Sequence, residues 1–94
     1  MSENYHFEPE DHPKLNPMYL LRWEKSQDAY VLLYPEGIIK LNTTAAEILK
    51  LCTGESTVTD IIEKLKLLFV NSSDIGNSIH NFLEVTHGKG WINR

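Results

Sequence analysis

The residues best suited to chemistry in this 94-residue sequence are four histidines, one cysteine and scattered carboxylates. His80 and His87 lie in one predicted helix, which would separate them by roughly 10 Å along its axis, too far to share a metal unaided. Neither has a second cysteine or a cluster of carboxylates beside it, as a zinc site would require. We therefore expect solvent-facing histidines and no metal site.

Nucleophiles and phosphate-binding loops are equally scarce. Cys52 lies among apolar residues, where a thiol stays neutral and unreactive, so we expect it to pack in the core. The glycines never take the spacing of a phosphate-binding loop. No pair of acids lies at the end of an apolar strand, where burial would tune one as an acid and the other as a base. The sequence thus predicts no catalytic residue and no cofactor, and a small independent enzyme is disfavoured.

Length and charge narrow the class of protein further. Ninety-four residues with 41% hydrophobic composition suffice for one modest domain. The net charge of −4 at pH 7 repels phosphate backbones and disfavours nucleic acid as a partner. No apolar run reaches the roughly 20 residues that cross a bilayer, so we expect no membrane partner. A single cysteine and no signal-peptide pattern predict a cytoplasmic protein.

Residues 1–17 are predicted to form a flexible N-terminal arm. They hold three of the four prolines and several acids, a composition with little apolar surface to bury. Tyr5, Phe7 and Leu15 offer the alternative that the arm docks on the domain or on a partner, but chain ends are usually mobile. The composition changes after this segment, and residues 18–94 are predicted to form the domain.

Three strands open the predicted domain. Residues 19–24 and 29–34 are rich in aromatic and aliphatic strand formers, and the polar residues 25–28 between them predict a hairpin turn. The next connection, YPEG, has the composition of a type I turn with a bulge, which would put Gly37 in a left-handed conformation. A third strand is predicted at 38–41.

The first predicted helix spans residues 44–52. Thr44 and Glu47 have the spacing of a capping box, in which each side chain hydrogen-bonds the other residue's backbone N–H. Apolar residues then recur at helical spacing on one face, and Gly54 can end the helix in a left-handed conformation.

Two more helices follow. Thr57 and Asp60 repeat the capping pattern at the start of the second, and a polar break at 71–73 separates it from the third. Gly88 and Gly90 should end the third helix before the final apolar residues. The predicted fold class is therefore α+β, a three-stranded antiparallel sheet followed by three helices in the order βββααα.

The third strand leaves an edge available for pairing. A three-stranded sheet has two edges, and residues 38–41 lack proline and carry only Lys40 as a charge that would discourage pairing. Such an edge suggests strand addition by an extended peptide. Strand aromatics could instead stack on nucleic-acid bases, but this spacing is more typical of a face packed on helices. These aromatics are Tyr19, Trp23, Tyr30 and Tyr34.

A longer pattern resembles a known family. The PEG turn that leads into an LNxTAxxIL helix resembles pyrroloquinoline quinone (PQQ) biosynthesis protein D, and the likeness runs from Pro17 to the C-terminus. The matching residues of the first part are Tyr34, Pro35, Glu36, Gly37, Leu41, Asn42, Thr44, Ala45, Ile48, Leu49 and Gly54. Those of the second part are Thr57, Ile61, Phe82, Leu83, Gly90, Trp91 and Ile92.

The resemblance implies a winged-helix-like peptide chaperone, not an enzyme. The resemblance further implies a relation to the recognition elements for ribosomally made, post-translationally modified peptides. Such a protein binds the precursor peptide of the quinone and presents it to a radical S-adenosylmethionine enzyme. In the wider class of such recognition elements, the peptide adds as a strand beside the third strand and lies against the third helix. Carried onto this chain, the groove would be formed by Ile38, Ile39, Lys40, Leu41, Ile79, Phe82 and Leu83.

Two alternatives remain open from the sequence. The chain is either specific for the quinone precursor or a recognition element for a different modified peptide. A winged-helix DNA-binding regulator is disfavoured, because residues 73–87 carry no Lys or Arg that a recognition helix would need. We expect a monomer, with an edge-mediated dimer as the alternative.

Overall fold

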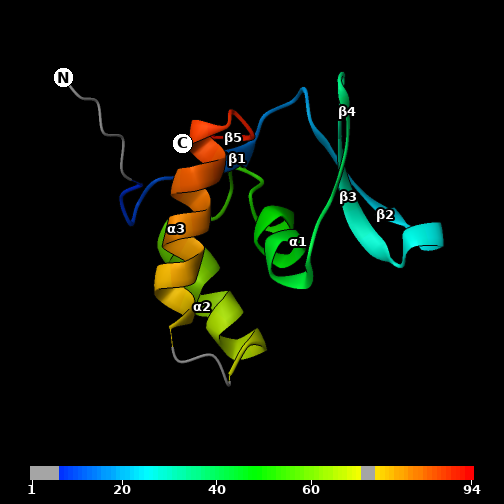
Figure 1. Ribbon diagram of the computed structural model, residues 1–94. Helices are drawn as coiled ribbons and strands as arrows, with labels where there is room; N and C mark the ends of the chain where they lie inside the picture. Colours follow the sequence, from blue (N-terminus) through cyan, green and yellow to red (C-terminus); the bar gives the residue numbers. More distant parts are fainter. Residues whose placement is uncertain (1–6, 71–73) are drawn as a thin grey trace.

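The computed structural model describes residues 7–70 and 74–94 (Figure 1). Its central sheet has the order β2–β3–β4, and the helices α1, α2 and α3 follow it in the chain. This confirms the predicted α+β fold, to which the structure adds a small second sheet of β1 and β5. The elements are β1 (Lys14–Leu15), β2 (Leu20–Glu24), the 3-10 turn η1 (Lys25–Gln27), β3 (Ala29–Tyr34), β4 (Gly37–Lys40), α1 (Thr43–Lys50), α2 (Val58–Leu68), α3 (Ile75–Gly88) and β5 (Ile92–Asn93).

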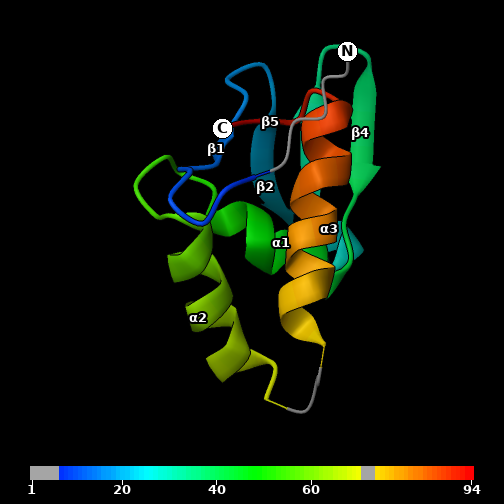
Figure 2. The same ribbon diagram turned by 90° about the vertical axis from the view of Figure 1, so that its left-hand side faces the viewer.

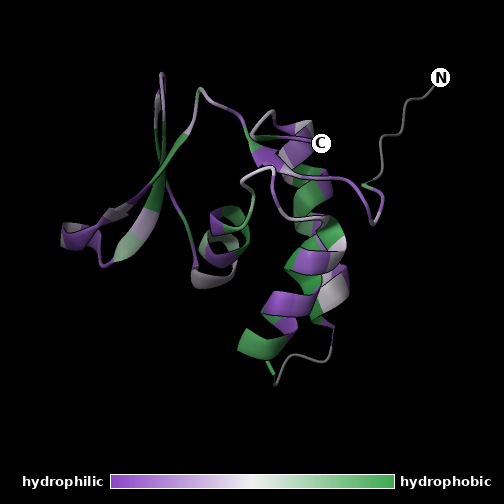
Figure 3. Ribbon diagram, turned by 180° about the vertical axis from the view of Figure 1, so that it is seen from behind, coloured by the Kyte–Doolittle hydropathy of each residue, from purple (hydrophilic) through white to green (hydrophobic). Residues whose placement is uncertain are grey.

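One face of the central sheet packs on the helices. Leu32 in β3 pairs with Leu21 of β2 and Ile39 of β4, and all three belong to or pack against the buried core. Helix α1 contacts β3 and lies between the sheet and the pair formed by α2 and α3 (Figure 1). Figure 3 shows apolar and polar residues on each helix, as expected where one side of a helix faces the core.

The turn between β3 and β4 is tighter than the sequence suggested. Tyr34 pairs directly with Gly37, so only Pro35 and Glu36 connect the strands. Gly37 is a strand residue whose φ is not positive, and the predicted left-handed conformation is wrong. A two-residue connection needs no bulge, because the pairing continues up to the turn.

The helix starts are fixed by side-chain caps. At α1 the cap is Asn42, whose Oδ1 accepts from the Ala45 N–H at 2.8 Å, so the capping box predicted for Thr44 is wrong. Asn42 takes this role because it is the extended residue that leaves the sheet, which places its side chain over the first turn. The capping box of α2 is confirmed. The Asp60 N–H donates to the Thr57 hydroxyl oxygen, and the Thr57 N–H donates to the Asp60 carboxylate.

Residues 7–16, predicted as part of a flexible arm, form a strap across the helical side of the molecule. The Asp11 and Pro13 carbonyls accept from the Val58 and Gly54 N–H groups at 3.0 Å each. Leu15 in β1 pairs with β5. Phe7 and Leu15 pack on the domain, as in the alternative that the arm docks there. The break predicted at 71–73 and the docking residue Tyr5 lie outside the described residues.

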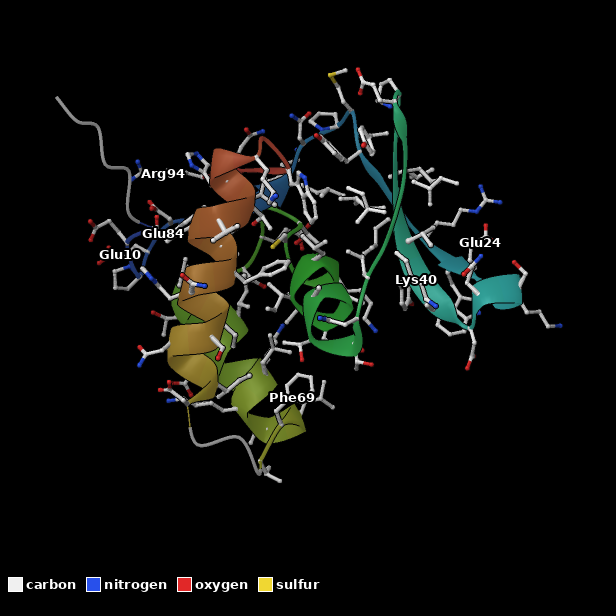
Figure 4. All side chains as sticks on the ribbon, in the orientation of Figure 1. Glu10, Glu24, Lys40, Phe69, Glu84 and Arg94 are labelled. Atoms are coloured by element: carbon white, nitrogen blue, oxygen red, sulfur yellow. The ribbon has the colours of Figure 1, made fainter. Side chains whose placement is uncertain are left out.

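Phe7 anchors the strap on α3. Its side chain is 4% exposed. The Phe7 N–H donates to Glu84 Oε2 at 2.8 Å, and its carbonyl lies 3.0 Å from His80 Nε2. The Phe7 ring meets the ring of His87 edge-on, with centroids 5.4 Å apart. The two histidines predicted to face solvent therefore hold the strap. Figure 4 shows Glu84, with Glu10 and Arg94, on the side of α3 away from the sheet.

Alanine substitutions should distinguish the two glycines at 37 and 54. Gly54 has φ of +88° and an added Cβ would lie 3.2 Å from Lys14 Cδ, whereas a Cβ at Gly37 would meet Tyr34 Oη at an ordinary 3.9 Å. We expect Gly54→Ala to cost about 1 kcal/mol or more of unfolding free energy. The matched Gly37→Ala should change it by less than about 0.5 kcal/mol. Urea unfolding of both variants measures this, and equal midpoints would contradict the assigned conformations.

Candidate peptide-binding site

The free edge of β4 is the first component of the site. β4 is the last strand of the order β2–β3–β4, so one side of it meets no other strand of the described residues. Pairing alternates along an antiparallel ladder. Gly37 opposes Tyr34 across the turn, and the Leu41 N–H donates to the Tyr30 carbonyl at 3.0 Å. Gly37, Ile39 and Leu41 therefore bond to β3.

The backbone groups of Ile38 and Lys40 consequently point away from the sheet. Each offers one N–H and one carbonyl to an added strand, at the spacing of alternate strand residues. Their side chains lie on the outer face, where Ile38 is 66% exposed. The Ile39 side chain lies on the inner face and packs against the core. The edge thus presents two pairs of backbone donors and acceptors.

A hollow between α1 and α3 is the second component. Its volume is about 300 Å³, and Asn42 links it to β4 because that residue follows Leu41 at the end of the sheet. Figure 2 shows β4 on the same side of the molecule as α3, with α1 beside them. The hollow is lined by Asn42, Thr44, Ala45, Ile48, Ser78, Asn81, Phe82 and Val85. The hollow therefore lies near the end of β4 from which Leu41 and Asn42 continue, and we call it the α1–α3 hollow.

Only one of the three predicted α3 residues lies in this hollow. Ile79 and Leu83 are both 0% exposed and belong to the core, whereas Phe82 is partly buried and lines the hollow. Val85, which is 48% exposed, lines it too and was missed. A signal for it existed, because Phe82 and Val85 are three residues apart and share a helical face beside the buried stripe. Of the four predicted strand residues, Leu41 is 7% exposed and serves the core.

Cys52, the one cysteine of the sequence, has a structural role. Burial raises the pKa of the Cys52 thiol to about 12, and its Sγ lies 3.3 Å from the Ile48 carbonyl. The thiol is therefore neutral at physiological pH and hydrogen-bonded to the last turn of α1. Across residues 7–70 and 74–94, no three His, Cys, Asp or Glu side chains are grouped as metal ligands.

None of the described helices has the length and apolar character needed to cross a membrane.

Similar proteins point to one family. The family described as coenzyme PQQ synthesis protein D (PqqD) matches residues 29–92. A protein of Methylococcus capsulatus named PqqA binding protein is 41% identical over 85 residues, which cover 90% of each chain. A PqqA binding protein of Acinetobacter baylyi is 40% identical over 80 residues, covering 85% of this chain and 81% of that one.

A solved structure agrees in fold. The solution structure of the PqqD part of Methylobacterium extorquens PqqCD superposes with a TM-score of 0.75 at 29% identity, covering 94% of this chain and 95% of that one. It is described as a functional, stand-alone recognition element for ribosomally synthesised and post-translationally modified peptides. The resemblance seen in the PEG turn and the helix after it is confirmed, and the chain belongs to the PqqD family of coenzyme PQQ synthesis proteins.

Proposed function

We propose that this chain binds PqqA, the precursor peptide of PQQ, by strand addition to β4 and presents it to a radical S-adenosylmethionine enzyme. The observation that carries the proposal is the free edge of β4 beside the α1–α3 hollow. The names of the relatives from Methylococcus and Acinetobacter support the choice of peptide. The chain is then a binding protein rather than an enzyme, and acts in the cytoplasm.

The geometry suggests how the peptide is held. An extended peptide running antiparallel to β4 exchanges hydrogen bonds with the backbone of Ile38 and of Lys40. The peptide residue between those two pairs opposes Ile39, so its side chain points to the inner face. The apolar groups of Phe82 and Val85 line the hollow on that side. Backbone pairing gives affinity here, and the hollow favours an apolar side chain.

Other functions receive less support. α3 carries no Lys or Arg over Ile75–Gly88, which disfavours insertion into a DNA groove. A recognition element for a different modified peptide would use the same edge, and competition between peptides decides between the two. We propose a monomer, because pairing of two β4 edges would compete with the peptide.

The proposal is tested by titrating the isotope-labelled chain with synthetic PqqA while following backbone amide shifts. We expect the largest shifts at 38–40 and 78–85, with a scrambled PqqA as the control. Shifts confined to the strap or to α2 would overturn strand addition. Sedimentation at the same concentrations should give a monomer that forms a one-to-one complex with PqqA. A dimer of the free chain that dissociates when the peptide is added would contradict the monomer.

Two neighbouring residues of α3 should separate binding from stability. Phe82 is partly buried and lines the hollow, whereas Leu83 is 0% exposed. Phe82→Ala should weaken PqqA binding several-fold even when the chain stays fully folded, because it removes a wall of the hollow. Leu83→Ala should lower the unfolding free energy by about 2–5 kcal/mol, with PqqA affinity of the folded fraction little changed. Calorimetric binding and urea unfolding of both variants test this, and the opposite assignment of effects would refute it.

A further inference from the structure

On the outer face of the central sheet, two rows of side chains run across the strands from β2 to β4, the strand beside which the peptide would add. The register places Leu20, Leu33 and Ile38 side by side across the three strands. Leu20 and Ile38 are 56% and 66% exposed, so this apolar row is open to solvent at both ends. None of α1, α2 and α3 covers this row, since these three helices pack on the opposite face.

The second row is cationic at its ends. Arg22 and Lys40 lie on either side of Val31, which is 1% exposed although it is on the outer face. Val31 and Lys40 line a hollow on this face together with Ile38 and Glu24. Arg22 Nε lies 3.8 Å from Glu24 Oε2, whereas Lys40 has no ion pair with any described residue. Lys40 therefore offers a cation beside the edge that an added strand would occupy (Figure 4).

The apolar row ends at Ile38 and the second row ends at Lys40, the two residues of β4 whose backbone groups point away from the sheet. A peptide residue hydrogen-bonded opposite Lys40 or Ile38 places its own side chain on the outer face, directly beside that residue. Opposite charges and paired apolar groups stabilise such cross-strand neighbours. The two peptide positions are two residues apart, because Ile38 and Lys40 are.

We propose that this outer face selects the sequence of the bound peptide, taking an acidic residue opposite Lys40 and an apolar residue opposite Ile38. In an antiparallel strand the residue opposite Lys40 comes first, so the recognised order is acidic, inward-facing, apolar from N- to C-terminus. The inference rests on the proposed strand addition to β4. The side chains of Lys40 and Ile38 then give specificity, while the outward backbone groups of the same two residues supply most of the affinity.

A charge swap tests the cationic position. The probes are synthetic PqqA and variants in which each acidic residue is replaced in turn by lysine. We expect Lys40→Glu to weaken binding of unmodified PqqA by about three- to tenfold, since attraction at a cross-strand pair becomes repulsion. One lysine variant of the peptide should bind the Lys40→Glu chain better than it binds the wild type. Lys66→Glu on α2 has the same change in net charge and should leave every affinity unchanged.

The apolar position is tested on the same peptides. Ile38→Thr keeps a strand-favouring side chain but removes apolar surface, and should weaken PqqA binding about two- to fivefold. The charge swap identifies the PqqA acid that lies opposite Lys40. In the Ile38→Thr chain, replacing the PqqA residue two positions after that acid by threonine should weaken binding little further. If that insensitive position instead lay two residues before the acid, the antiparallel order would be overturned.

The outcomes also separate this inference from the function on which it rests. If Lys40→Glu behaves as Lys66→Glu does and no lysine peptide is rescued, outer-face selection is wrong. Should the β4 amides still shift with unmodified PqqA in that case, strand addition stands without it. An absence of β4 shifts would instead refute the strand addition itself.

Discussion

Replacing Lys40 with proline should leave the domain folded and weaken PqqA binding by about tenfold or more. Proline removes the outward N–H of Lys40, and its ring occupies space that the added strand needs. A main-chain hydrogen bond contributes about 0.5–1.5 kcal/mol net, and 1.4 kcal/mol corresponds to a factor of ten in affinity. The ladder to β3 survives, because the Leu41 N–H still donates to the Tyr30 carbonyl. Calorimetry measures the affinity, and circular dichroism checks the fold.

Two control variants isolate the backbone donor. Lys40→Ala removes the charge but keeps the N–H, so it should cost less than about fivefold. Ile39→Pro removes an N–H that faces β3, and we expect it to destabilise the hairpin itself. A folded Lys40→Pro chain that binds PqqA as tightly as the wild type would show that β4 does not pair with the peptide.

Phe7→Ala should lower the unfolding free energy by about 3–5 kcal/mol, the cost typical of truncating a buried aromatic ring. Phe7 is 4% exposed and is held by α3 through both its backbone and its ring. For a domain of this size the melting temperature should fall by roughly 12 °C or more. Differential scanning calorimetry gives the value directly.

A matched change on the same segment serves as the control for Phe7. Glu10 is exposed on the strap, so Glu10→Ala should change the unfolding free energy by less than about 0.5 kcal/mol. Equal melting temperatures for Phe7→Ala and the wild type would mean that the strap does not dock in solution. A large effect of Glu10→Ala would instead indicate that charge, and not the buried ring, holds the strap.

The strands and helices were predictable because their signals are local. The capping box of Thr57 and the apolar stripe of α2 each lie within one turn or a few turns of the chain. The strap gave no such signal, because its stability comes from contacts with residues distant in sequence, such as Glu84 and Arg94. Local composition alone cannot show that a proline-rich segment has partners there.

For the candidate site, the edge strand was predictable from the sequence, whereas the face of α3 that lines the hollow was not. The edge at β4 follows from strand order, and a short strand with Lys40 as its only charge marked it. On α3, adjacent helical faces differ by one residue, and the sequence does not tell which face borders the hollow. The likeness to the family pointed to Ile79, Phe82 and Leu83 together. Of these, Phe82 borders the hollow, whereas Ile79 and Leu83 belong to the core.

The pairing of β1 with β5 also affects how the molecule folds. Lys14 opposes Asn93, and the Asn16 N–H donates to the Trp91 carbonyl at 2.8 Å, so these bonds join segments at opposite ends of the chain. Closing a loop that long costs roughly 4 kcal/mol of chain entropy, whereas the hairpins and helices form from near neighbours. We therefore expect the small sheet to form late in folding. During synthesis, the strap leaves the ribosome well before β5 and must wait for that later strand before this sheet closes.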